Sequence, residues 1–130
     1  MKFGYTIIYV PDVSASLSFF EKAFGFSRHF LHESGTHGEL ETGETTLAFA
    51  AHELTEMNFR TGHVQANKSP EPLGVEVAFV ADNVPAAHEW ALTAGAVELA
   101  SPVSKPWCQV VSYVRCPDGA LVELYSPVSP

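Results

Sequence analysis

Two glutamates stand out, because each interrupts a strand-like run of apolar residues. Glu76 lies in VEVAFV and Glu123 lies in ALVELY. A carboxylate at such a position should face something other than the hydrophobic core, since burying an unpaired charge is unfavourable. One interpretation is that both side chains project into a cleft as ligand contacts, acid–base groups or half of a metal site. If they lie close together, one of them should have a raised pKa. The alternative is a solvated open sheet face or a structural hydrogen bond.

The six histidines are possible metal ligands, but their spacing is poor. His29 and His32 are three residues apart in a predicted strand and therefore point to opposite faces. His37 and Glu39 share a face but lack a third ligand nearby, and His88 is predicted to be an exposed or half-buried helix residue. We therefore interpret the histidines as surface residues and expect no metal site and no cofactor.

Aromatic residues on predicted strands or strand edges form a third set: Tyr5, Tyr9, Trp107, Tyr113 and Tyr125. Trp107 follows Lys105-Pro106 at the exit of a loop, where it either stacks on a ligand at the mouth of a cleft or packs in the ordinary way. The sequence holds no Ser-His-Asp arrangement, phosphate-binding loop or dinucleotide fingerprint. Nucleophilic and nucleotide chemistry are therefore not expected.

These residues are positioned by a unit that occurs twice, at 4–25 and at 74–95. Both copies run from an apolar strand through an Asp-bearing turn into a helix that stops at Gly, where a left-handed cap is favourable. An offset of 70 residues aligns Asp12 with Asp82. The sequence also allows an alignment in which the strands are shifted by one residue. The choice between the two alignments decides on which face of the sheet each side chain lies.

Each copy continues into three further strands, so each half reads βαβββ and the fold class is α+β. The predicted strands cover 5–10, 26–33, 37–42 and 45–52 in the first half and 75–80, 97–100, 107–115 and 120–125 in the second. A Pro-bracketed loop is predicted at 101–106 and the second helix at 84–94. We expect one domain over 1–130, with module one at about 1–53, a linker at about 54–72 and module two at about 73–130.

Composition limits the partners. The formal net charge is −8, with seven Lys and Arg and no basic cluster, which argues against nucleic acid and anionic membrane as partners. The first residues reach Pro and Asp after a short apolar run, so neither a signal peptide nor a spanning helix is expected and a cytoplasmic location is predicted. In that reducing compartment Cys108 and Cys116, which lack CxxC spacing, are expected to be free thiols.

With its repeated βαβββ unit, the opening YTIIYVPDVSASLSFFEKAFGF and the closing RCPDGALVELYSP, the chain resembles the vicinal oxygen chelate superfamily over nearly its whole length. This superfamily contains glyoxalase, extradiol dioxygenases, fosfomycin resistance enzymes and the bleomycin-resistance binding proteins. The resemblance implies paired βαβββ modules that form a U-shaped cleft, within a homodimer.

The resemblance also implies where a metal would bind. Metal-dependent members carry His, Glu or Gln on the first and fourth strands of each module, and Tyr5, Ala48, Glu76 and Glu123 stand at these positions. Only two of the four are ligand types, neither is His, and tyrosine, with a reference pKa of about 10, is a poor ligand unless ionised. Because a transition metal normally takes three or four protein ligands, this departure argues against metal catalysis.

The branch that remains is similar to the bleomycin-resistance proteins, which bind a drug in the dimer clefts without altering it. We therefore expect a non-catalytic protein that sequesters an aromatic peptide or glycopeptide antibiotic in dimer clefts and thereby confers antibiotic resistance. One alternative is an enzyme, either metal-dependent like glyoxalase or a dioxygenase, or one that uses Glu76 or Glu123 as a general base. Another is an interaction module without a small ligand. The predicted ligand-binding residues are Tyr5, Ile7, Tyr9, Ala48, Glu76, Trp107 and Glu123.

Overall fold

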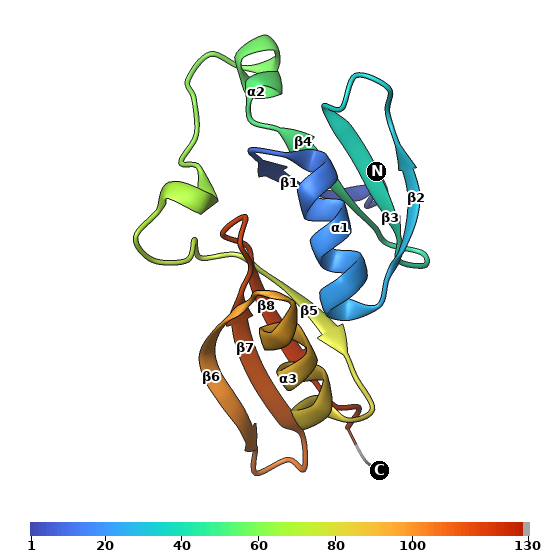
Figure 1. The fold of residues 1–130 in the computed structure, drawn as a ribbon, viewed down its shortest axis with the longest axis vertical. Coiled ribbons are helices and arrows are strands. Elements are labelled where there is room, and N and C mark those ends of the chain that lie inside the picture. The colour runs from blue at the N-terminus through green and yellow to red at the C-terminus, as the bar shows by residue number, and fades with distance from the viewer. Residues whose placement is uncertain (129–130) are drawn as a thin grey trace.

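The computed structural model describes residues 1–128 and contains two four-stranded sheets, each with one long helix (Figure 1). The first module consists of β1 (Tyr5–Val10), α1 (Val13–Phe24), β2 (Ser27–Leu31), β3 (His37–Glu41) and β4 (Thr46–Ala51). A linker with α2 (Glu53–Asn58) and the 3-10 helix η1 (Ala66–Lys68) follows. The second module consists of β5 (Glu76–Val80), α3 (Val84–Ala94), β6 (Val97–Ser104), β7 (Val110–Arg115) and β8 (Leu121–Tyr125). The α+β fold of two βαβββ modules is thus confirmed.

Both sheets have the same topology, with the orders β1-β4-β3-β2 and β5-β8-β7-β6. The first and last strands of each module pair in parallel, and the other neighbours pair antiparallel. As a result β1 and β5 are edge strands, and each leaves one side of its backbone without a partner in its own sheet.

The two long helices begin in the same way. Asp12 caps α1 and Asn83 caps α3, each by accepting a hydrogen bond from the backbone amide three residues on, at 3.0 and 3.1 Å. The repeat offset at the caps is therefore one residue longer than predicted, and the alignment of Asp12 with Asp82 is wrong. The first strands follow the same shift, so Tyr5 and Glu76, each the first residue of its strand, are equivalent.

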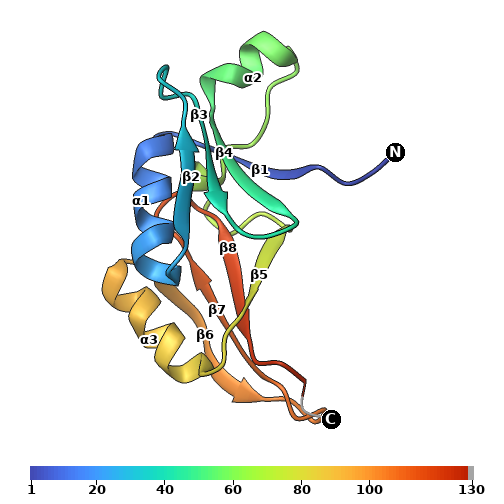
Figure 2. The same cartoon turned by 90° about the vertical axis from the view of Figure 1, so that its right-hand side faces the viewer.

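The modules share one core. Both helices cover the same side of the two sheets (Figure 2) and pack against each other. Phe79 of β5 reaches into the first module, where its ring centroid lies 5.1 Å from that of Phe24 and 4.8 Å from that of Phe26. Phe20 of α1 packs edge-on against Phe49 of β4 at 4.9 Å. This aromatic cluster fixes the position of β5 relative to α1.

Polar contacts join the modules as well. The Ser16 hydroxyl on α1 donates a buried hydrogen bond of 2.7 Å to Asp118 in the turn between β7 and β8. The Trp90 indole on α3 donates to the backbone carbonyl of Lys22 on α1. Because each bond joins a residue of one module to a residue of the other, these contacts and the aromatic cluster together hold the two sheets in one relation.

The linker is attached to the second module. The Arg115 guanidinium donates to the carbonyl oxygens of Ala66 and Ser69, both at 2.8 Å, and to that of Pro70 at 3.3 Å. Gly119 (φ +92°) lies so close to the backbone of η1 that a Cβ atom there would collide with Ala66. The residues before β5 are thus held against the β7–β8 turn.

The region around the predicted 101–106 loop differs from expectation. β6 continues through Pro102 to Ser104, and β7 starts only at Val110. Proline is tolerated because β6 is an edge strand, where a missing amide donor breaks no sheet bond. Trp107 consequently lies in the tight turn between β6 and β7 rather than in a strand, beside Cys108 with its φ of 63°. Cys108 and Cys116 are both free.

His88 also differs from expectation. Its side chain is 1% exposed, so the prediction of an exposed or half-buried residue is wrong. The reason is a pair of distant partners: His88 Nδ1 lies 2.9 Å from the Ser112 hydroxyl on β7, and Nε2 lies 2.7 Å from a Glu98 carboxylate oxygen on β6. Although these are serine, histidine and acid side chains, Ser112 is fully buried, so no substrate can reach its hydroxyl and the network is structural.

Candidate functional site

Three polar side chains meet on the face of the second sheet that α3 leaves open. Glu76 lies on β5, Glu123 on β8 and Tyr113 on β7, and the strand register places Glu123 opposite both Ala78 and Tyr113. The Tyr113 hydroxyl donates a hydrogen bond of 2.8 Å to Glu123 Oε1. Glu76 lies two residues before Ala78 on the same strand, near enough to Glu123 for the charge of one carboxyl group to act on the other.

The electrostatics follow from this crowding. Desolvation raises the pKa of Glu76 above its ordinary value of 4.5, and the charge of Glu123 and a hydrogen bond with it raise that pKa further. The pKa of Tyr113 is raised to about 12, mainly because its hydroxyl donates to Glu123, with desolvation and the two carboxylate charges adding to the effect. The cluster therefore concentrates negative charge, and a cation or an N–H donor placed beside it would relieve the repulsion.

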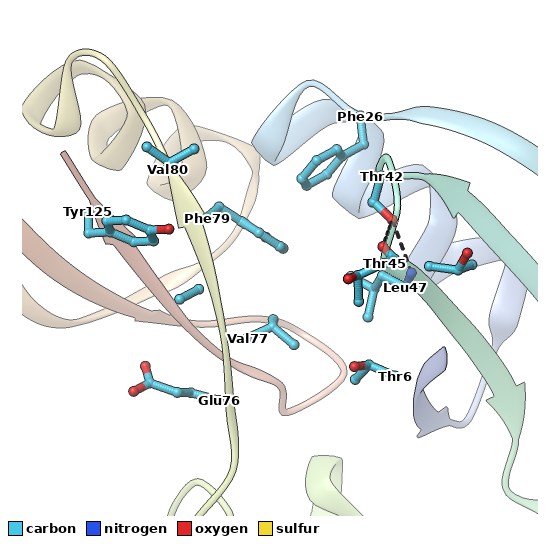
Figure 3. Close-up of a pocket in the computed structure, with 12 residues that line it drawn as sticks. Thr6, Phe26, Thr42, Thr45, Leu47, Glu76, Val77, Phe79, Val80 and Tyr125 are labelled. Atoms are coloured by element: carbon cyan, nitrogen blue, oxygen red, sulfur yellow. Dashed lines mark hydrogen bonds between the residues drawn. The ribbon is translucent and has the colours of Figure 1, made fainter. Parts of the chain in front are cut away.

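Two cavities open beside this cluster, between the edge strands β1 and β5. They share Thr6, Glu76 and Val77 in their linings, and their volumes are about 440 and about 330 Å³, within the range of small-molecule pockets. Figure 3 shows the first cavity, with Val77 pointing toward Thr6 and Glu76 on the opposite side of β5. The second cavity is mostly apolar and lies next to the linker.

Three of the predicted ligand-binding residues line a cavity. Ile7 and Tyr9 line the second cavity, and Glu76 borders both. Glu123 lies next to Glu76 in the acidic cluster. Tyr5 lies outside both linings and is 53% exposed at the start of β1.

The remaining two predicted residues lie elsewhere. Ala48 on β4 is fully buried, with Ile7 opposite it on one side and Glu39 on the other. Trp107 is 57% exposed, and its indole donates to the Gln109 side chain at 2.7 Å. Trp107 is outside the linings of the two cavities, so its stacking on a ligand stays a prediction.

Tyr113 is the member of the cluster that sequence reasoning did not assign to the site. The signal that could have found it is the turn Pro117-Asp118-Gly119, because a hairpin centred on Asp118 places residues at equal separations opposite each other. Tyr113 and Glu123 each lie five residues from Asp118, and they are register partners.

A transition metal does not fit this donor set. Of the four positions that metal-dependent members of the resembled superfamily would use, Ala48 on β4 has no donor atom, and Tyr5 on β1 offers only a phenol, a poor ligand unless ionised. Glu123 already accepts from Tyr113. Across residues 1–128, no three His, Cys, Asp or Glu side chains gather so that they could hold a metal ion. Glu76 and Glu123 alone fall short of the three ligands such a site normally needs.

The fold of two βαβββ modules defines the class of protein, and comparison with known families identifies that class. Residues 3–129 match the glyoxalase-like domain family, and the chain belongs to that family. No curated protein matched the chain. In the part of the chain that the structure describes, no helix is long and apolar enough to cross a membrane.

Solved structures share this fold. A glyoxalase/bleomycin resistance protein/dioxygenase family enzyme from Burkholderia phytofirmans PsJN is 21% identical, with a TM-score of 0.77 over 96% of this chain and 97% of that one. A glyoxalase-related enzyme from Fulvimarina pelagi is 20% identical, with a TM-score of 0.80 over 98% and 88%. A protein of unknown function from Agrobacterium tumefaciens str. C58 is 24% identical, with a TM-score of 0.77 over 98% and 94%. The superfamily resemblance is thus confirmed at the level of fold.

Proposed function

We propose that the protein binds and sequesters a small aromatic ligand that carries a cationic group, in particular a peptide or glycopeptide antibiotic, without altering it chemically. The observation that carries the proposal is the cluster of Glu76, Glu123 and Tyr113 beside the two cavities between β1 and β5. The lack of fit to a transition metal supports binding over metal-dependent catalysis. The cytoplasmic location expected from the sequence stays a prediction.

The geometry suggests how such a ligand would lie. The flat part would enter the mostly apolar second cavity, against Ile7 and Tyr9 of β1. The cationic part would then reach Glu76, which borders that cavity, and the neighbouring Glu123. A cation there would let both carboxyl groups ionise, because its charge offsets their mutual repulsion.

The first prediction concerns Glu123→Gln. This substitution removes one charge while keeping the shape, and we expect it to weaken the binding of bleomycin A2, a cationic aromatic glycopeptide, roughly 10-fold or more, because hydrogen bonds to charged groups contribute about 1.5–3 kcal/mol. Isothermal titration calorimetry at pH 7.5 measures the change. Lowering the pH toward 4.5 should weaken binding to the wild type, because the raised pKa of Glu76 lets it take up a proton early in that descent.

Glu89→Gln is the matched control, since Glu89 is an exposed residue of α3 and the charge change is the same. It should leave the Kd for bleomycin A2 unchanged. Equal affinities for the wild type and Glu123→Gln, or no binding of bleomycin A2 at micromolar concentration, would count against the proposal. If the uncharged planar antibiotic actinomycin D bound more tightly than bleomycin A2, the cationic group of the ligand would not be needed for binding.

The second prediction is a homodimer. β1 and β5 have free edges. Apolar side chains are exposed on them and just before β5, among them Ile7 at 44%, Val80 at 58% and Val75 at 76%. A partner chain can cover these edges and complete the cleft. Light scattering after gel filtration should give twice the 14.1 kDa chain mass. Ile7→Lys, which places a charge on the edge strand, should shift the mass toward one chain. A wild-type mass of one chain at micromolar concentration would refute the dimer.

One observation favours a second candidate, an enzyme in which Glu76 acts as a general base. A carboxylate whose pKa is raised toward the working pH is a better proton acceptor than an ordinary one. Mass spectrometry of the ligand after incubation separates the two functions, because sequestration returns it unchanged. A new product that disappears with Glu76→Gln would establish the enzyme.

A further inference from the structure

A second cluster of ionisable groups lies where the linker passes beside the second cavity. His52, directly after β4, meets His63 of the linker: His52 Nδ1 is 2.8 Å from His63 Nε2. The two rings stack with centroids 5.0 Å apart at 29°. His63 also packs against Tyr9 of β1, with ring centroids 5.4 Å apart. Neither histidine belongs to the acidic cluster, and neither was singled out from the sequence.

The hydrogen-bond partners define the protonation of this pair. His52 Nε2 lies 3.1 Å from Asn67 Oδ1, and an amide oxygen can only accept, so His52 Nε2 carries the proton. Neutral His52 therefore offers a lone pair at Nδ1, which accepts from His63 Nε2–H. One added proton can be accommodated if His63 changes tautomer and accepts in turn. With two added protons both facing nitrogens are donors, and the hydrogen bond is lost.

This contact tethers a short segment that has few other polar contacts. Before it, the Phe59 amide donates to the Thr55 carbonyl at 2.8 Å and ends α2. After it, η1 is held by Arg115. Among the hydrogen bonds described for residues 1–128, the only one that involves residues 60–64 is the His52–His63 bond. Gly62, with φ +75°, makes the turn just before His63.

The tethered segment covers the second cavity. His63 and Val64 contribute to its lining and lie across from Ile7 and Tyr9 of β1. Because Val64 is itself 65% exposed, apolar packing alone gives the segment little hold. We call residues 60–65 the strap.

The charges around His52 favour release in acid. Desolvation lowers the pKa of His52 from its ordinary value of 6.5; the Asn67 hydrogen bond opposes this, and the positive charges of His63 and Lys68 lower it further. The charged groups acting on His52 from the linker and η1 are thus both basic, and the group facing His63 from β1 is the Tyr9 ring. Neutral His52 is therefore the favoured form in the folded protein, and the stability that depends on it is lost as the pH falls below 6.5 and through the lowered pKa of His52.

We propose that the strap is a pH-sensitive cover of the second cavity, closed at neutral pH through the His52–His63 hydrogen bond and open in acid, where protons on both facing nitrogens break that bond. The proposal does not rest on the identity of any ligand of the acidic cluster. It adds control of access: the cavity exchanges its contents more freely when the pH falls.

The experiment is ¹⁵N relaxation on the full chain at pH 7.5 and 5.0, with His63 variants that separate charge from contact. In the wild type, order parameters of the strap should fall from about 0.85 to about 0.6 or below on acidification. His63→Gln can donate to or accept from His52 in either state and should stay ordered at both pH values. His63→Ala has no tether and should be mobile at both. His29→Gln, on β2, is the matched control and should follow the wild type.

Access to the cavity is read with N-phenyl-1-naphthylamine, which is uncharged over this pH range. Its fluorescence should rise on acidification with the wild type and His29→Gln, be high at both pH values with His63→Ala and stay low with His63→Gln. A strap equally ordered at pH 7.5 and 5.0, or loosening that persists in His63→Gln, overturns the proposal. Loosening without any change in probe fluorescence overturns the role of the strap as a cover.

Discussion

Gly119→Ala is expected to destabilise the protein by roughly 2–5 kcal/mol, the sum of a left-handed backbone penalty and a steric clash. Gly119 has a φ of +92°, and an added Cβ would meet the backbone of Ala66 and Asn67 in η1. Backbone atoms cannot move aside as the end of a flexible side chain can. The substitution should therefore separate the linker from the β7–β8 turn, and urea unfolding followed by tryptophan fluorescence measures the loss of stability.

Substitutions at two other glycines separate the backbone penalty from the steric clash. Gly35 has a φ of +75°, and a Cβ added there would have nothing within 4 Å, so Gly35→Ala should show the backbone penalty alone, about 1–2 kcal/mol. Gly74 has neither a positive φ nor a close neighbour, so Gly74→Ala should be neutral or slightly stabilising. If Gly119→Ala were no more destabilising than Gly35→Ala, the close approach of linker and turn would be wrong.

The second large effect is expected at His88. His88→Leu replaces the imidazole by an apolar side chain of similar bulk and leaves the fully buried Ser112 hydroxyl without its partner. Such a loss costs about 1–3 kcal/mol. Glu98, whose side chain is 46% exposed, can turn to water and should add little. Thermal unfolding of the wild type and the variant measures the difference.

A double-mutant cycle separates this hydrogen bond from packing. Ser112→Ala alone leaves His88 Nδ1 without its hydrogen-bond partner. The double variant with His88→Leu and Ser112→Ala removes both partners together. The double variant should therefore be about 1–2 kcal/mol more stable than the sum of the single effects predicts. Simple additivity would show that the His88–Ser112 hydrogen bond contributes nothing to stability.

The bounds of a helix or strand could be predicted where residues next to its ends favour a start or a stop. The helix predicted at 84–94 has the observed bounds of α3, because Asn83, the proline at the helix start and Gly95 act within one turn of its ends. β6 could not be bounded in this way. Its passage through Pro102 depends on its being an edge strand, which is a property of the whole sheet.

The site was predictable where the pattern was local and not where partners are distant. Two glutamates in apolar strands indicated an open face, and the structure brings Glu76 and Glu123 together with a raised pKa for Glu76. The partners of His88 lie 10 and 24 residues away, and His52 and His63 are 11 residues apart. Such pairs arise from the tertiary fold, so no periodicity in the sequence predicts them.

The equivalent strand positions of the two modules carry different side chains. On the open face of the first sheet, Ala48 lies between Ile7 and Glu39; on that of the second, Glu123 lies between Ala78 and Tyr113. In evolutionary terms, two modules with one topology are the expected product of a duplication, after which their roles diverged. At the central position of these sets the first copy has the small aliphatic Ala48 and the second has the carboxylate of Glu123, so the copies now offer different groups to a ligand at the junction.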